Sequence, residues 1–345
     1  MTIAPIQGPL TPQVTLPVTP VRPVIPVTPP AAPSIEINSG QVRAQLIAKT
    51  AQEAAGRQGG LAPLVADLSQ ALRNPMLPAQ VRSAAALVLA QARPADGRVS
   101  GADIAKALAQ SGLFLEARLA SEPRANPRGQ DLKAELLVLR QALAAWLAGA
   151  PRAPVRTPGR APPPPYRGAG ASTQPAASPS LPSDAPLSAV GQRLLAETEG
   201  AVARQELLQI ASMPAGADEP LETQLVTRWM FEMPFTTPQG AAVAQFEVGR
   251  DRRGTQEGEE PAWRVAFSLD IEPLGPIHAR VSLRAAQMTV GLWAEREVGL
   301  DRLRQGQDLL AHALRQADLS AEIAIQAGSP PMRAPEAGRL VDQTS

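Results

Sequence analysis

The chain has 345 residues, of which 37 are prolines and only 3% are aromatic, and alanine makes up much of its 44% hydrophobic fraction. Large aliphatic and aromatic side chains supply most of the free energy of burial, so this composition does not fill the whole length with packed cores. The net charge is +1, and the basic residues are spread along the chain, which excludes the basic face of a nucleic-acid-binding protein. The lack of cysteine excludes disulfides and thiolate metal sites.

No basic segment followed by an apolar core stands at the N-terminus, so we expect no cleaved secretory signal. The longest run of small apolar residues, at 84–92, is too short to span a bilayer. We therefore expect no membrane insertion. If the protein leaves the cytoplasm, we expect it to use an export pathway that does not depend on a cleavable signal.

Residues 1–34 are dominated by proline, valine and threonine, with proline at every third position from Pro20 to Pro29. Each proline fixes φ and lacks an N–H group, so a helix and a central strand are both disfavoured. We predict a disordered segment of extended, polyproline-II character that acts as a tether or an export signal.

Residues 35–150 are predicted to be helical, because apolar residues recur there at helical spacing. One of the helices opens at Ser100 and Asp103, whose side chains can cap exposed N–H groups. The predicted helices cover residues 41–55, 61–72, 81–92, 100–119 with a break at 111–112, and 132–147. Their alanine-rich faces predict a small or loosely packed bundle that unfolds at low cost.

Residues 151–186 are predicted to be a flexible linker. They contain a run of four prolines at 162–165, followed by glycine, alanine, serine and further proline. A segment of this composition cannot bury enough surface to order itself.

Residues 187–328 are predicted to form a compact C-terminal domain. A helix at 187–213 precedes strands at 225–235 and 242–250, and large apolar residues alternate with small or polar ones at 263–271, as in a half-buried strand. A turn at 272–276 leads into a second alternating strand at 277–283. A third strand from Met288, a helix at about 296–317 and a short strand around Ile323 complete an α+β fold, an antiparallel-rich sheet with a packed helix. The tail at 329–345 is predicted to be disordered.

No catalytic constellation is visible in the sequence. His278 and His312 are the only histidines and belong to no ligand-spaced cluster, so we expect no metal site. The acidic cluster Glu257, Glu259 and Glu260 is predicted to be a solvated loop. No nucleophile-elbow or Walker pattern lies between a strand and a helix, so we predict a non-enzymatic protein without a cofactor.

The run from Pro273 to Leu283, with the preceding strand from Trp263, resembles the C-terminal domain of the flagellar hook-length control family. That domain carries a strand, a proline-x-leucine-glycine-like turn, two alternating strands, a leucine-containing helix and a short β segment. The resemblance covers about 187–328. The stretch 111–119 with 131–133 is similar to the helical N-terminal half of family members, and 205–214 resembles the helix that precedes their sheet.

The resemblance implies a molecular ruler that is exported from the cytoplasm through the flagellar type III apparatus and reports how long the hook has grown. Its C-terminal domain would contact the cytoplasmic domain of the export switch protein and change the exported substrates from hook-type to filament-type subunits. Hook and hook-cap subunits are further candidate partners. We expect a monomer, and no nucleic acid as a partner.

The resemblance also implies a partner-binding site for the export switch in the turn, in the strand after it and in the last helix. Its residues would be Pro273, Leu274, Gly275, Pro276, Ile277, Ala279 and Leu310. The alternative interpretation is that Ile277 and Leu310 are core residues.

Two other functions are compatible with the sequence. A cytoplasmic adaptor could share the C-terminal domain without being exported, and would then be absent from the culture supernatant. A proline-rich scaffold could bind SH3-like modules through its polyproline-II segments, and would lose its partner when residues 1–34 are deleted.

Overall fold

The computed structural model of the chain describes residues 39–122, 126–149, 161–214, 224–252 and 261–331. The proline-rich segment 1–34, the acidic cluster at 257–260 and the tail beyond residue 331 lie outside these residues. The chain divides into two units, 1–43 and 44–345. Of the first unit, the structure describes residues 39–43, which are the start of a helix.

The helices form where the apolar periodicity predicts them, with bounds that differ by a few residues. They are α1 (Ser39–Arg57), α2 (Leu61–Ala71), α3 (Ala79–Leu89), α4 (Gly101–Ala109), α5 (Leu115–Ser121), α6 (Leu132–Trp146) and α7 (Leu187–Ser212). The predicted cap of α4 is confirmed, because the Ser100 hydroxyl accepts from the Asp103 N–H at 3.2 Å and the Asp103 carboxylate accepts from the Ser100 N–H at 3.0 Å. These hydrogen bonds with Ser100 lower the pKa of Asp103.

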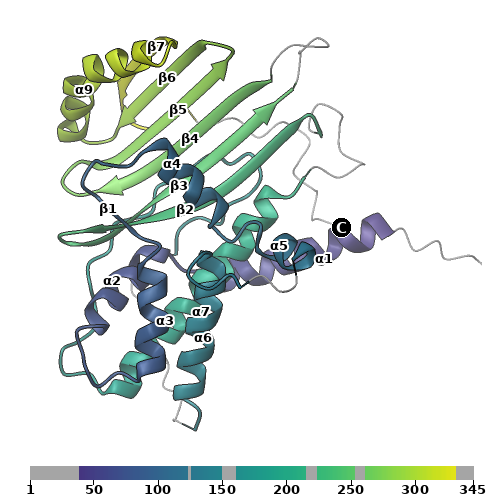
Figure 1. Cartoon of the computed structure of the whole chain (residues 1–345), viewed down its shortest axis with the longest axis vertical. Helices are drawn as coiled ribbons and strands as arrows, with labels where there is room; N and C mark the ends of the chain where they lie inside the picture. Colours follow the sequence, from purple (N-terminus) through teal and green to yellow (C-terminus); the bar gives the residue numbers. More distant parts are fainter. Residues whose placement is uncertain (1–38, 123–125, 150–160, 215–223, 253–260, 332–345) are drawn as a thin grey trace, which may run out of the picture. The chain divides into compact units, whose positions relative to one another are not determined.

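The strands form one sheet whose spatial order follows the chain order. Its antiparallel strands are β2 (Val226–Thr237), β3 (Gly240–Asp251), β4 (Ala262–Ile271), β5 (Gly275–Arg284) and β6 (Gln287–Ala294). At one edge, β1 (Arg93–Pro94) pairs in parallel with β2, and at the other, β7 (Ser320–Ala327) pairs in parallel with β6. The crossover from β6 to β7 is α9 (Glu297–Gln316), which packs on these two strands (Figure 1). The predicted α+β class with an antiparallel-rich sheet and a packed helix is thus confirmed.

Helices α2, α3, α6 and α7 share one hydrophobic core with the start of β3. Leu64, Leu68, Leu136 and Leu139 are fully buried there, and Val243 of β3 belongs to the same cluster. The bundle is therefore well packed rather than loose. The reason is that it closes on the sheet, which covers the apolar surface that small alanine-rich helices cannot cover alone.

Strands β2 and β3 are buried on both faces. On one face, Phe231, Phe246 and their neighbours pack against α4 and the segment around Leu113. On the other face, Glu232 of β2 accepts a hydrogen bond at 2.8 Å from Arg204 of α7, and both side chains are fully buried. These two strands connect the helices to the rest of the sheet (Figure 1).

Residues 161–181, which we call the strap, have almost no regular structure but are held along their length. The carbonyls of Pro162 and Pro163 accept hydrogen bonds from Gln58 and Arg204. Further along, Ala177 exchanges both backbone hydrogen bonds with Ala241 of β3. This part of the expected linker differs from a flexible spacer, because proline carbonyls remain strong acceptors for polar side chains of the body.

Candidate partner-binding surface

One face of the sheet is apolar from end to end because alternate residues of neighbouring strands lie in register. Phe246 of β3 pairs with Phe267 of β4, which pairs with Ala279 of β5. In the same way, Leu269 of β4 pairs with Ile277 of β5. The odd-numbered residues of β4 and β5 therefore lie on one face, as the alternation in the sequence predicts.

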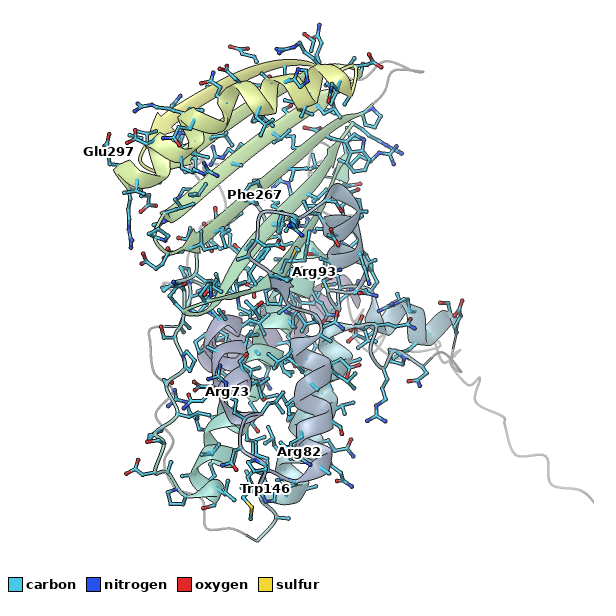
Figure 2. The ribbon with its side chains drawn as sticks, turned by 60° about the vertical axis from the view of Figure 1, so that its left-hand side comes forward. Arg73, Arg82, Arg93, Trp146, Phe267 and Glu297 are labelled. Atoms are coloured by element: carbon cyan, nitrogen blue, oxygen red, sulfur yellow. The ribbon has the colours of Figure 1, made fainter. Side chains whose placement is uncertain are left out.

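Two helices cover this apolar face only in part. The region around α4 packs on β2 and β3, and α9 packs on β6 and β7. Between them most of the large apolar residues of β4 and β5 are only half-buried, and Figure 2 places Phe267 on this stretch of the sheet. We call these residues the open strip: Val265, Phe267, Leu269, Ile277, Val281 and Leu283.

The open strip ends in a pair of tryptophans. Trp263 is 39% exposed, and its ring stacks on Trp229 with 6.5 Å between centroids. The guanidinium of Arg250 lies 5.6 Å from the Trp263 centroid, a cation–π distance. Apolar, partly exposed area that includes an aromatic ring is typical of interaction surfaces.

The turn between β4 and β5 is fastened to the N-terminus of α9. Gly275 has φ +74°, and a Cβ there would lie 2.5 Å from Arg296 side-chain atoms, so both the turn and the close approach require glycine. Arg296 forms a bidentate ion pair with Glu272, with nitrogen–oxygen distances of 2.7 and 3.1 Å. Burial raises the pKa of the neighbouring Asp270, and the charge of Arg296 opposes that rise.

The structure separates the predicted partner-binding residues into three groups. Pro273 is exposed and Leu274, Pro276 and Ile277 are half-buried, so they present surface, whereas Gly275 and Ala279 are buried. Leu310 is half-buried in the C-terminal half of α9, whose N-terminal end packs on the turn at Gly299. Leu310 lies eleven positions after Gly299 in the same helix, a rise of roughly 16 Å, so Leu310 does not adjoin the turn.

A serine, a histidine and a glutamate line up on the opposite face of the sheet, a feature that sequence reasoning missed. The Ser268 oxygen lies 2.8 Å from Nδ1 of His278, and Nε2 of that ring lies 3.0 Å from Glu295 Oε1. Ser268 is fully buried, and its hydroxyl donates to the Ala171 carbonyl at 2.9 Å. A nucleophile must reach its substrate, so this array fastens the strap to the sheet instead of performing acyl transfer.

Within the described residues, no group of three or more histidine, aspartate and glutamate side chains could hold a metal ion. None of the helices in the same part of the chain is long and apolar enough to cross a membrane. The candidate functional feature of the C-terminal region is a partly apolar surface, which consists of the open strip, the turn beside it and the exposed Trp263 at its end.

Comparison with known proteins gives one match. Residues 251–334, from the end of β3 through β7, match the family model described as Flagellar hook-length control protein FliK. No curated protein and no solved structure matches the chain. The match confirms the family that the sequence resembles, although it does not reach the segments at 187–250 and in the N-terminal half. Over residues 251–334 the chain is therefore similar to the flagellar hook-length control family.

Proposed function

We propose that this protein controls hook length during assembly of the bacterial flagellum, and that its C-terminal region makes the export apparatus change from hook-type to filament-type substrates. The family match at residues 251–334 is the observation that carries the proposal. The direct partner would be the cytoplasmic domain of the export switch protein. The role is one of binding and signalling and needs no catalytic group.

The open strip supports this proposal as the contact surface. It lies within the family-matched segment, and its apolar side chains are partly exposed between α4 and α9. The turn residues Pro273, Leu274 and Pro276 adjoin it at Ile277. Burying such a strip against a partner contributes roughly 25 cal/mol per Å² of apolar area, so a charge placed in it should abolish binding.

The first test is hook length by electron microscopy in a deletion strain complemented with variants. The deletion should give abnormally long hooks without filaments, and Ile277→Asp should fail to complement it. Thr289→Asp is the matched control, because Thr289 is exposed on the opposite face of β6. Urea unfolding of both purified variants excludes misfolding as the cause. Normal hooks and filaments in the deletion strain would refute hook-length control, and full complementation by Ile277→Asp would refute the open strip as the contact surface.

The ruler function requires the residues that precede α7 to adopt an extended conformation. About 185 residues span roughly 570 Å as polyproline II and roughly 280 Å as helix. Insertions for this test belong between residues 150 and 160, because the strap at 161–181 is tied to the body. Hook length should increase with the length of the insertion, and a constant length would exclude a ruler.

The adaptor that is never exported is the second candidate. The shared core of α2, α6, α7 and β3 favours it, because export of residues 44–331 in extended form would first require this unit to unfold. Detection of the protein in the culture supernatant of flagellated cells would exclude the adaptor, and its absence there would exclude the ruler.

A further inference from the structure

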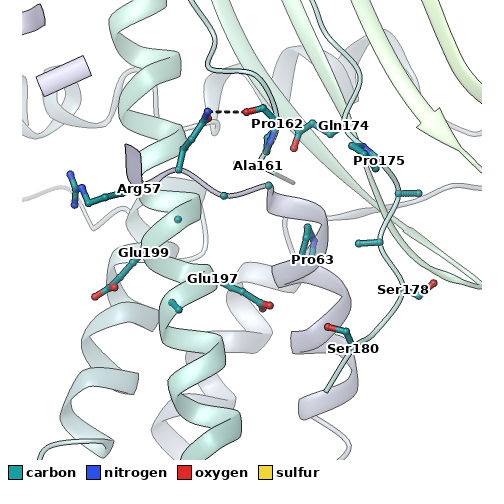
Figure 3. Close-up of a pocket in the computed structure, with 17 residues that line it drawn as sticks. Arg57, Pro63, Ala161, Pro162, Gln174, Pro175, Ser178, Ser180, Glu197 and Glu199 are labelled. Carbon is teal, nitrogen blue, oxygen red and sulfur yellow. Dashed lines mark hydrogen bonds between the residues drawn. The ribbon is translucent and has the colours of Figure 1, made fainter. Parts of the chain in front are cut away.

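A cavity of about 510 Å³ lies outside the family-matched segment, within the volume range of known ligand sites. Figure 3 shows its walls: α7 on one side, residues 57–63 across one end and the strap at 174–180 on the other side. Neither the hook-length proposal nor the open strip makes use of it.

The lining of the cavity is suited to a peptide ligand with small side chains. Gly59, Gly60 and Gly200 contribute no side chain, and a Cβ on Gly200 would lie 2.9 Å from the Gly59 nitrogen. The apolar part of the wall consists of alanine and proline, among them Pro63 and Pro175. Among the described residues, no aromatic side chain lines the cavity, so it offers no stacking platform for a planar ligand.

A buried amide oxygen at the cavity wall lacks a hydrogen-bond donor. Gln174 is 2% exposed, and its amide nitrogen donates to Glu232 at 2.5 Å. Its Oε1 has no partner and lies 3.4 Å from the place where a Cβ of Gly60 would stand. An unpaired buried acceptor costs about 1–3 kcal/mol, and an N–H group placed in the cavity would remove that cost.

The strap also has an edge that is directed away from β3. Ala177 directs its N–H and C=O at Ala241, with both bonds at 2.8 Å. In an extended chain the neighbouring residues direct theirs to the opposite side. Those neighbours are Ala176 and Ser178, and both line the cavity. The strap is thus paired on one side and is a free strand edge on the other.

We propose that this cavity binds an extended peptide segment of a partner protein, rich in alanine, valine and proline, by β-strand addition to the strap. The peptide would exchange backbone hydrogen bonds with Ala176 and Ser178 and donate an N–H to Gln174. The small side chains of the peptide fill the space above Gly59 and Gly60. Main-chain hydrogen bonds give the affinity in this mode, and pockets for alternate side chains give the specificity.

The test uses the full chain and a labelled, capped peptide of sequence Ala-Val-Ala-Pro-Ala-Val-Lys, with binding measured by fluorescence anisotropy. The wild-type chain should bind this peptide, and a version methylated at alternate backbone nitrogens should bind at least tenfold more weakly. Equal binding of the two peptides would overturn strand addition. Absence of binding to the wild-type chain would overturn the site.

Two pairs of variants place the binding in this cavity. Ser178→Pro removes the backbone N–H that faces the cavity and should weaken binding about tenfold, whereas Ser178→Ala should bind as the wild type. Gly60→Val fills the cavity and should abolish binding, whereas Gly56→Val, at an exposed glycine with nothing within 4 Å, should not change it. If Ser178→Pro fails to fold, Gly60→Val alone decides the question. Unchanged binding to Gly60→Val would overturn the proposal.

Discussion

The helices with β2–β3 and the family-matched segment β4–β7 with α9 share one sheet, but they bury their side chains to very different degrees. The largest fully buried side chains of the described residues all precede residue 234, among them Leu64, Leu139 and Phe231. In α9 only Gly299 and Leu300 are buried, and alternate residues of β7 are exposed. The segment that matches the family model therefore has fewer buried side chains than the helices with β2–β3.

This contrast differs from the expectation that the alanine-rich helices unfold at low cost, because in the structure they share a buried core with β3. Burial is the main favourable term in folding, so the helices with β2–β3 should be the last part to open. The family-matched segment leaves apolar area uncovered, as a surface that binds a partner requires. The difference between the two regions can be tested by perturbing each in turn.

The largest effect is expected at the buried ion pair between Arg204 and Glu232. Arg204→Met leaves a fully buried carboxylate without its cation, which should lower the free energy of unfolding by about 3–5 kcal/mol. Urea denaturation of the full chain measures this. Arg57→Met is the matched control, because Arg57 is exposed and lies 3.7 Å from Glu206, so its loss should cost at most about 0.5 kcal/mol. Equal effects of the two changes would mean that the buried pair does not anchor the helices to the sheet.

A smaller effect is expected from truncating one leucine in each region. Leu139→Ala, at a fully buried site of α6, should cost about 3 kcal/mol, because it removes buried area and leaves a cavity. Leu303→Ala, at a half-buried site of α9, should cost about 1 kcal/mol. Hydrogen exchange of the same proteins should show slower exchange in α6 than in α9. The reverse order of either quantity would contradict the burial argument.

Much of the fold could be predicted from local periodicity. The alternation at 263–271 and 277–283 predicts β4 and β5 and the face on which their apolar residues lie, and the serine–aspartate pair predicts the cap of α4. Proline density also predicts that the strap has no helix. Each of these features depends on residues within one element, which is why a single sequence reveals them.

The features that the sequence could not reveal depend on partners far apart in the chain. The Pro162 carbonyl accepts a hydrogen bond from Gln58, which is 104 residues away in the chain. Arg204 of α7 donates a hydrogen bond to Glu232 of β2. An arginine in a predicted helix is ordinarily assigned to solvent, so its full burial leaves no local signal. The open strip could not be predicted from the sequence either. Alternation predicts the apolar face of the sheet, but only the tertiary structure places α4 and α9 so that Phe267 and Ile277 stay partly uncovered.

An effect that depends on pH is expected from a buried carboxyl pair that ties α7 to α2 and the strap. Burial, reinforced by the nearby carboxylate of Asp67, raises the pKa of Glu197 to about 8, while Arg193 opposes the rise. Asp67 in turn accepts hydrogen bonds from the Ser180 N–H and hydroxyl. At neutral pH the native state therefore keeps a proton on Glu197 that the unfolded chain, with an ordinary carboxyl near 4.5, has lost.

Stability should consequently fall as the pH rises from about 4.5 to about 8 and then level off, because the native state binds the extra proton throughout this window. The slope is at most about 1.4 kcal/mol per pH unit, which gives roughly 2 kcal/mol between pH 6 and pH 8. Glu197→Gln resembles the protonated acid and should flatten the curve over this range, whereas Glu199→Gln, at an exposed site of the same helix, should leave the wild-type slope. Urea denaturation at several pH values measures both curves. A wild-type slope retained in Glu197→Gln would assign the pH dependence to groups other than Glu197.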